Sequence, residues 1–346
     1  MTRVLASVSA EYPAAGMAEL RRAAAVDGAT VTRLGPDLVA VDGNGVTATR
    51  LAGLARAADL VFCKHLATVV GSVEPSDLVS VDTAAAAADR LLVAAGALSV
   101  DRLAVQAWAS GAPTLPFTPG ALAAALTRRL EAAGRLVAPA GQQWTAALVM
   151  CGQDILVGWT RARDCLSDWP GGRVRLARRS EQVSRAEFKL EELFKTDAVE
   201  LPRRGQALDL GASPGGWTRI LRARGLDVTA VDPGDLAPAL ARDRRVRHVR
   251  TTAGRFLRAS SDRFDVIVND MRMAPAQSVK TMLDARRAVR TGGLMVMTLK
   301  LGVVTSPAAM VHRSLTSLAG DYDVVFARQL HHNRHEITIA ARPRGR

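Results

Sequence analysis

The second half of this 346-residue chain predicts an α/β fold built on a doubly wound, mostly parallel sheet. Three observations lead to this fold class. From about residue 206 onward, strand-like apolar runs alternate with helical patterns; a glycine-rich turn joins the first run to a helix; and only five residues, LHHNR, separate the last two runs. Strands that alternate with helices are typical of parallel βαβ units.

Seven strands are expected in this half, and only the last should be reversed. Five residues are too few for a parallel crossover, so the last two strands should form an antiparallel hairpin. The strands are expected at 206–212, 226–232, 246–251, 263–270, 293–299, 322–329 and 335–342, with helices at 215–224, 235–242, 276–290 and 306–319.

The first half predicts smaller α+β modules that meet near residue 95. Strands are expected at 3–9, 36–41, 59–63, 102–109, 144–150 and 154–159, and helices at 14–25, 81–96 and 119–133. A basic connector, 166–185, follows these modules. We expect its arginines to lie along RNA phosphates, although a solvated linker is the alternative; they are Arg173, Arg175, Arg178, Arg179 and Arg185.

Composition favours a polyanionic partner. The net charge is +13 and the pI is about 10.9. Arginine suits phosphate because its planar fork makes bidentate contacts. An arginine-rich composition without function is the alternative, but it does not by itself explain the imbalance over the 33 acidic residues.

Cysteine usage and hydropathy indicate a cytoplasmic protein. The three cysteines have no CxxC spacing, so we expect buried, reduced thiols, no disulfide framework and no metal site. No stretch approaches a transmembrane span and the start shows no sustained apolar leader, so no membrane association is expected.

The stretch LDLGASPGGWTRIL (208–221) predicts a nucleotide-like cofactor site. It lacks the G-x-G-x-x-G pattern of dinucleotide sites, so a cofactor without a pyrophosphate fits better than NAD. About 20 residues on, Asp232 ends the next strand, where a carboxylate can accept both ribose hydroxyls. An ordinary turn and a surface aspartate are the alternative. The candidate residues of the turn are Gly211, Ser213, Pro214, Gly215, Gly216 and Trp217.

Three ionisable residues should meet at one edge of the predicted sheet. Asp270 and Lys300 end the fourth and fifth strands, and Glu336 begins the reversed seventh strand. Ligands bind at this carboxyl edge in open α/β sheets. Only five of the 46 basic residues are lysine, which makes Lys300 unusual. The alternative is that each is a polar residue where a strand reaches the surface.

Five short motifs resemble, in order and spacing, the FtsJ-like ribose 2′-O-methyltransferases. They are SRAEFKL, DLGASPGGW, VND, TLKL and HEITI, between residues 184 and 342. The resemblance implies a Rossmann-like fold over 186–346, S-adenosylmethionine as cofactor and a catalytic tetrad at Lys189, Asp270, Lys300 and Glu336. It also implies that Asp270 borders the cofactor, and it places Thr252 where the family has an acidic residue near the adenine.

Two neighbouring stretches are similar to the ribosomal RNA large-subunit methyltransferase M group. They are DILVGWTRARDCLSDWPGGRVRL and RQLHHNRHEITIAARPR. This similarity implies a cytidine ribose of large-subunit rRNA as the target and rRNA as the partner. No obligate protein partner is evident from the sequence. It also implies an N-terminal module at 1–95 and a THUMP-like RNA-binding domain at 96–165.

The expected chemistry is methyl transfer to a ribose 2′-hydroxyl. Lys300 is the candidate base, because lysine can lose its proton whereas arginine cannot. Lys189 should orient the substrate, and Asp270 and Glu336 should orient the two ammonium groups. The alternatives are the same chemistry on tRNA, mRNA or small-subunit rRNA, a non-catalytic RNA-binding protein that keeps the sheet, and an NAD-dependent dehydrogenase.

A basic cluster, RDRRVRHVR (242–250), is a further candidate for holding rRNA phosphates. A solvated helix end is the alternative. His331, His332 and His335 lie on the predicted hairpin turn without a known zinc spacing, so we do not expect them to hold a metal.

Overall fold

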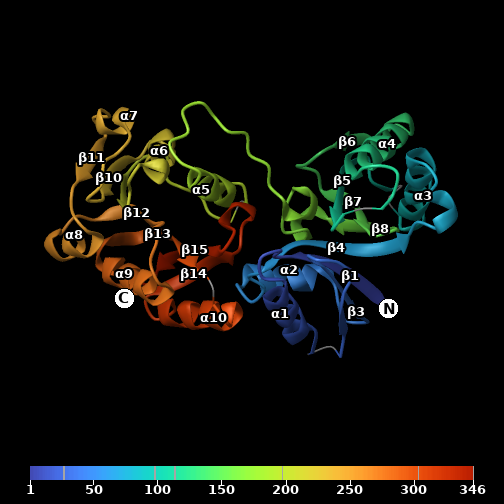
Figure 1. Cartoon of the computed structure of the whole chain (residues 1–346), viewed down its shortest axis with the longest axis horizontal. Coiled ribbons are helices and arrows are strands. Elements are labelled where there is room, and N and C mark those ends of the chain that lie inside the picture. The colour runs from blue at the N-terminus through green and yellow to red at the C-terminus, as the bar shows by residue number, and fades with distance from the viewer. Residues whose placement is uncertain (26–27, 97–98, 113, 197, 303, 346) are drawn as a thin grey trace. The chain divides into compact units, whose positions relative to one another are not determined.

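The computed structural model describes residues 1–25, 28–96, 99–112, 114–196, 198–302 and 304–345. The chain forms two compact units, Met1–Arg175 and Leu176–Arg346 (Figure 1). Among the described residues, no helix combines the length and the apolar composition needed to cross a membrane.

The first unit contains an eight-stranded sheet in the order β2-β3-β1-β4-β8-β7-β5-β6. Its strands are β1 (Thr2–Val8), β2 (Thr30–Arg33), β3 (Leu38–Gly43), β4 (Cys63–Ser72), β5 (Arg102–Ser110), β6 (Leu136–Ala138), β7 (Trp144–Cys151) and β8 (Asp154–Arg161). Its helices are α1 (Pro13–Ala25), α2 (Ala48–Arg56), α3 (Val81–Ala94) and α4 (Pro119–Ala132).

Three hydrophobic clusters of described residues fill this unit, and the helices of the two larger clusters come from before and after β4 in the sequence. Helices α1 and α2 contribute Leu20 and Leu51 to a cluster with β1 and β3. Helices α3 and α4 contribute Leu92 and Leu126 to a cluster with β5, β7 and β8. Strand β4 pairs with both β1 and β8, so it joins the two halves into one sheet.

The first half was predicted less accurately than the second. The strand expected at 59–63 is wrong, because residues 60–62 are buried but lie before β4, which begins at Cys63. Strands β2 and β6 were missed because they are short, exposed edge strands without apolar alternation. All three cysteines carry free thiols, but Cys151 is only partly buried.

The second unit contains a seven-stranded sheet in the order β11-β10-β9-β12-β13-β15-β14. Strand β15 pairs antiparallel with both neighbours, and the other pairings are parallel. The predicted seven strands and terminal hairpin are therefore confirmed, in a Rossmann-like arrangement. The strands are β9 (Gln206–Leu210), β10 (Asp227–Val231), β11 (Val246–Val249), β12 (Phe264–Asn269), β13 (Val289–Lys300), β14 (Tyr322–Arg328) and β15 (Glu336–Pro343).

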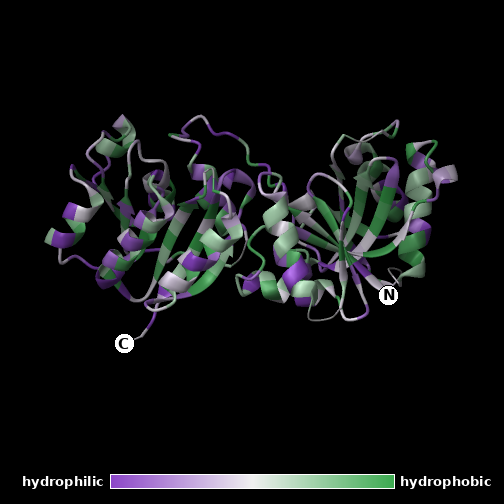
Figure 2. Cartoon of the chain, turned by 60° about the horizontal axis from the view of Figure 1, so that its bottom comes forward, coloured by the Kyte–Doolittle hydropathy of each residue, from purple (hydrophilic) through white to green (hydrophobic). Residues whose placement is uncertain are grey.

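Helices cover both faces of this sheet (Figure 1). Helices α5 (Glu187–Phe194) and α6 (Gly216–Ala223) lie together on one face, while α8 (Ala253–Ala259), α9 (Pro275–Ala285) and α10 (Pro307–Leu318) group on the other. The short helix α7 (Pro238–Ala241) precedes β11. Hydrophobic colouring concentrates on the strands, and hydrophilic residues colour much of the helices (Figure 2). The expected helix 276–290 ends earlier, at Ala285, because β13 begins at Val289.

Helix α5 is joined at its start to α6. The buried carboxylate of Glu187 accepts hydrogen bonds from the backbone N–H groups of Val183 (2.7 Å) and Ser184 (3.2 Å). Its other oxygen accepts from Arg219 Nε on α6 at 2.8 Å. The Trp217 indole donates to the carbonyl oxygen of Ala186 at 2.8 Å. The glycine-rich turn that precedes α6 is therefore held against α5.

The end of α5 is joined to the loop of the β14–β15 hairpin. The buried carboxylate of Glu192 accepts from the backbone N–H groups of His331 (2.7 Å) and His332 (2.9 Å). It also contacts His332 Nδ1 at 2.6 Å. These residues form the short 3-10 helix η6 (His331–Asn333), which leads directly into β15. Glu192 thus fixes the loop that delivers Glu336.

Asp209, on the central strand β9, is fully buried and accepts a hydrogen bond from the Thr218 hydroxyl at 2.7 Å. Burial raises its pKa to about 7, against the opposing effect of the Thr218 hydrogen bonds. A carboxyl group that holds its proton more tightly when folded stabilises the protein at low pH. That contribution is lost as pH rises from its unfolded pKa of 3.8 through about 7.

We therefore expect Asp209→Asn to gain thermal stability relative to the parent as pH rises. Asparagine keeps an acceptor for Thr218 but carries no charge to desolvate. The difference in melting temperature should grow by about 6–11 °C between about pH 5 and pH 8, given ~1.4 kcal/mol per pKa unit and ~2–4 °C per kcal/mol. A difference that does not change with pH would contradict the assignment.

We expect Glu192→Ala to loosen the hairpin loop, because three hydrogen-bond donors lose one buried acceptor. Hydrogen exchange measured by mass spectrometry should be faster across residues 329–336. The matched control is Glu191→Ala, which removes the neighbouring carboxylate, 3.5 Å from Arg179. Equal exchange rates in the two variants would contradict the proposed anchoring.

Candidate active site

Four charged side chains meet at the carboxyl edge of the second sheet. Asp270 directly follows β12, Lys300 ends β13 and Glu336 begins β15. Because β15 is antiparallel, Glu336 lies directly opposite Lys300 in the strand register. Lys189 comes from α5, which covers this end of the sheet. The structure brings all four members of the predicted tetrad together.

The four groups form a closed ring of alternating charge. Lys189 Nζ lies 3.0 Å from both Asp270 oxygens and 2.7 Å from Glu336 Oε2. Lys300 Nζ lies 2.5 Å from Asp270 Oδ1 and 3.0 Å from Glu336 Oε1. The side chains are only 13–19% exposed. Two ammonium groups and two carboxylates balance, so the ring is neutral overall.

The surroundings determine which members of the ring keep their charge. Burial lowers the pKa of Lys189, but the nearby carboxylates of Asp270 and Glu336 outweigh burial, and the pKa lies above its usual value. Burial raises the pKa of Asp270, but Lys300 and Lys189 outweigh it, and that pKa lies below its usual value. Lys189 therefore stays a cation and Asp270 a carboxylate near neutral pH.

Thr298 is a fifth member of this cluster that the sequence reasoning missed. Its buried hydroxyl donates to Asp270 Oδ1 at 2.6 Å and accepts from Lys300 Nζ at 2.8 Å. As an ammonium, Lys300 donates hydrogen bonds to Asp270 and Thr298 and lies 3.0 Å from Glu336 Oε1. It accepts a proton only in its neutral form, with a free lone pair.

The glycine-rich turn lies at the same edge, between β9 and α6. Gly211 and Gly215 have φ values of 77° and 110°, which favour glycine. A Cβ atom at Gly211 would lie 2.1 Å from Met271 Cγ, and one at Gly215 would lie 2.3 Å from Leu240 Cδ1. Helix α6 begins at Gly216, so its first N–H groups face this edge.

Asp232, which follows β10, is hydrogen-bonded to the glycine-rich turn. Its carboxylate accepts from the backbone N–H groups of Ser213 (3.2 Å) and Gly234 (2.7 Å). The Ser213 hydroxyl donates to the Asp235 carbonyl oxygen at 2.8 Å. Each Asp232 oxygen keeps a further lone pair for a ligand hydroxyl.

The other predicted cofactor residues differ in their exposure. The exposed Pro214 offers its carbonyl oxygen to the backbone of Ala237 at 2.9 Å. Thr252 is exposed at the start of α8, where its hydroxyl accepts from Arg255 N at 3.4 Å. Trp217 is only 3% exposed and its ring belongs to the core, which leaves its backbone for any ligand contact.

The connector arginines do not form one cluster. Arg173 donates to Asp37 at 2.7 Å and to the Ala109 carbonyl oxygen at 2.9 Å, so it is tied to the first unit. Arg179 lies 3.5 Å from Glu191 on α5. The other three are exposed: Arg175, Arg178 and Arg185. Their contact with RNA stays a prediction.

Signals for the missed residues exist in the sequence. Ser184 and Glu187 have the S-x-x-E spacing of a capping box, and the Glu187 carboxylate does accept from the Ser184 N–H, although α5 itself begins at Glu187 with Ala186 as its N-cap. Thr298 and Lys300 alternate on a strand, so their side chains share one face. Glu192 has no comparable signal, because its partners are backbone groups more than 130 residues away.

Comparison with known proteins adds to this geometry. Residues 182–324 match the model of the family described as FtsJ-like methyltransferase. The ribosomal RNA large subunit methyltransferase M of Halorhodospira halophila (strain DSM 244 / SL1) is 39% identical over 177 residues, covering 50% of this chain and 51% of that protein. The same-named protein of Xylella fastidiosa (strain M12) is 34% identical over 230 residues, covering 63% and 64%. The chain thus spans about half to two thirds of the length of these curated relatives.

Solved structures resemble the chain only weakly. The crystal structure of TrmN from Thermus thermophilus is 16% identical with a TM-score of 0.40, covering 99% of this chain and 100% of that chain. A fibrillarin/Nop5p complex contains a chain 18% identical with a TM-score of 0.41, covering 50% and 88%. The sequence match and the seven-stranded sheet agree: residues 182–324 are similar to the FtsJ-like methyltransferase family.

Proposed function

We propose that the second unit transfers a methyl group from S-adenosylmethionine to a ribose 2′-hydroxyl of RNA, with large-subunit rRNA as the substrate. One observation carries this proposal. The ring of Lys189, Asp270, Lys300 and Glu336 lies at the sheet edge that also holds the glycine-rich turn. The names of the curated relatives favour rRNA of the large subunit.

The polar groups around the glycine-rich turn fit S-adenosylmethionine. Asp232 has free lone pairs for the two ribose hydroxyls. Gly211 and Gly215 present no side chain to a ligand, and a helix N-terminus favours a carboxylate. Thr252 offers a hydroxyl at the position assigned to the adenine. When bound, the cofactor supplies an electrophilic methyl group on a sulfonium.

The ring residues would align the hydroxyl and remove its proton. The 2′-hydroxyl is a poor nucleophile, so alignment and proton removal are what the protein has to supply. In our proposal Lys300, in its neutral amine form, would accept the proton of the 2′-hydroxyl on the lone pair of Nζ, while the 2′-oxygen would take the methyl group and S-adenosylhomocysteine would leave. Lys189, held as a cation, orients the substrate, and Asp270 and Glu336 hold both lysines in place. Thr298 keeps Lys300 Nζ pointed at the reacting edge.

The first unit is proposed to bind the RNA. The division into a module at 1–95, a THUMP-like domain at 96–165, a basic connector at 166–185 and the catalytic domain at 186–346 is part of this proposal. The net charge of +13 supports an RNA partner. The proposal further places the protein in the cytoplasm, with no obligate protein partner.

The RNA target is testable directly. Purified rRNA from a strain lacking this gene would be incubated with the protein and S-adenosylmethionine, and ribose methylation would be mapped by sequencing. We expect one new site, in a cytidine of large-subunit rRNA. A site in tRNA, mRNA or small-subunit rRNA would support the alternative target, and no site in any RNA would contradict the enzyme assignment.

Lys300→Arg should lose turnover but keep cofactor binding. Arginine preserves the positive charge between Asp270 and Glu336 but cannot accept a proton. We expect methyl transfer to fall by about 10²–10⁴-fold, the usual contribution of a general base. S-adenosylmethionine affinity, measured by calorimetry, should change little.

The matched control for this variant is Lys280→Arg. Lys280 is an exposed lysine on α9 whose ammonium group pairs with Asp284 at 3.0 Å. This variant should keep normal turnover. An active Lys300→Arg protein would rule out Lys300 as the base.

Thr298→Val should slow methyl transfer by about 10-fold or more, because it removes one hydrogen-bonded support of Lys300, worth ~1–2 kcal/mol. Thr298→Ser keeps the hydroxyl and should restore most of the rate. The rate should be measured as a function of pH, since loss of this support should move the profile of the valine variant. Equal rates and profiles for both variants would show that the hydroxyl has no role.

A further inference from the structure

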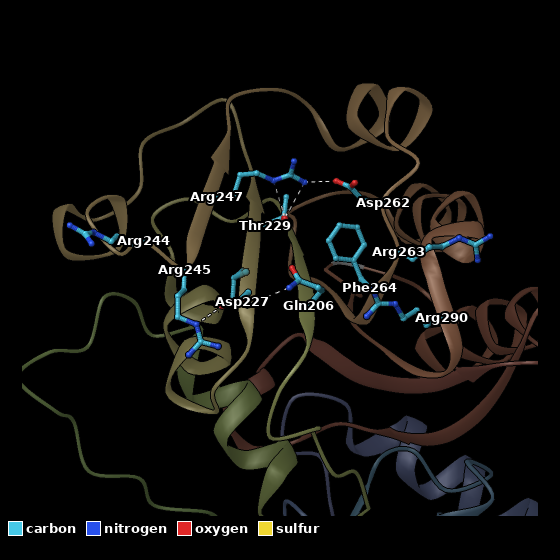
Figure 3. A pocket seen from close by; sticks show the side chains of 11 residues that line it. Gln206, Asp227, Thr229, Arg244, Arg245, Arg247, Asp262, Arg263, Phe264 and Arg290 are labelled. Atoms are coloured by element: carbon cyan, nitrogen blue, oxygen red, sulfur yellow. Dashed lines mark hydrogen bonds and ion pairs between the residues drawn. The ribbon is translucent and has the colours of Figure 1, made fainter.

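A pocket of about 610 Å³ opens at the amino edge of the second sheet, where strands β9 to β13 begin (Figure 3). Gln206 at the start of β9, Asp227 at the start of β10 and Phe264 at the start of β12 line it. The tetrad lies at the other end of the same strands. Strand β12 has six residues, so about 20 Å separates the two edges at ~3.3 Å per residue.

Arginine dominates the lining of this pocket (Figure 3). Five arginines and two aspartates, Asp227 and Asp262, line it, and a third carboxylate, Asp265, pairs with Arg290 from outside the lining, which leaves an excess of two positive charges. Three of these arginines come from the basic cluster 242–250, and two come from the starts of neighbouring strands. The five are Arg244, Arg245, Arg247, Arg263 and Arg290.

Three of the five arginines already have carboxylate partners. Arg245 pairs with Asp227, Arg247 pairs with Asp262, and Arg290 pairs with Asp265 at 2.7 Å. These arginine side chains are 46–57% exposed. Exposed ion pairs contribute only ~0–1 kcal/mol, so the guanidinium groups can exchange carboxylate for phosphate at little cost.

The remaining two arginines are available to a ligand. Among the residues that the structure describes, neither Arg244 nor Arg263 has a carboxylate partner. Arginines at this edge also complement the carbonyl ends of helices. Arg222 and Arg258 do so in the last turns of α6 and α8, and neither lines the pocket. One pocket arginine, Arg245, also donates to the carbonyl oxygen of Gly225, just after the end of α6, at 2.8 Å.

We propose that this pocket binds the phosphodiester backbone of the RNA substrate at a point remote from the target nucleotide. The identification of the ligand as RNA rests on the proposed function. Arginine forks bind phosphate oxygens in pairs, and several forks around one opening suit successive phosphates better than a single small anion. Such a contact adds affinity without touching the reacting groups.

The test is a double variant, Arg244→Gln with Arg263→Gln, in the full chain. Binding of a fluorescent mixed-sequence RNA would be followed by anisotropy across a salt titration. Loss of one or two phosphate contacts should weaken binding several-fold and lower the slope of log K against log salt by about 1–2. Binding of a trinucleotide, which is too short to reach both edges, and of S-adenosylmethionine should stay unchanged.

The matched control is Arg313→Gln, on the exposed face of α10 and outside the pocket. Thermal melting would show that each variant is folded. Unchanged affinity and salt slope in the double variant, or the same loss in the control, would overturn the proposal. If the parent protein binds RNA but never methylates it, the proposed function fails, while the comparison of variants still decides whether the pocket binds RNA.

Discussion

The ion-pair ring of Lys189, Asp270, Lys300 and Glu336 is the constraint on which the second unit depends. A partly desolvated charge without a partner is costly, so each of these groups needs two opposite neighbours at the same time. They come from a helix, two strand ends and one strand start. The ring forms only when all four segments are correctly placed.

The reversed direction of strand β15 is what places Glu336 beside Lys300. Were it parallel to β13, Glu336 would lie at the amino edge, far from Lys300. A shift of one residue in the register would turn its side chain to the opposite face of the sheet. Helix α5, which carries Lys189, is held in place because Glu187 joins it to α6 and Glu192 joins it to the hairpin loop. The same helix therefore links the glycine-rich turn to the tetrad.

The sequence predicted this half of the molecule well because its signals are local. Apolar runs, the glycine-rich turn and a five-residue loop are enough to predict a sheet with one reversed strand, and the strand order then brings Asp270, Lys300 and Glu336 to one edge. Contacts between segments that are distant in the sequence could not be predicted. Glu192 binds backbone groups, and Thr298 looks like an ordinary strand residue until Asp270 is placed beside it. In the first half, short exposed strands such as β2 gave no pattern to detect.

The most direct test of the proposed function is to find whether the protein methylates RNA and, if so, at which atom. The full chain would be incubated with isotopically labelled S-adenosylmethionine and unmodified rRNA, and the product digested to nucleosides for mass spectrometry. A ring that positions a lysine as proton acceptor for a hydroxyl predicts label in a 2′-O-methylated nucleoside. Label on a base, or no label in RNA, would contradict it.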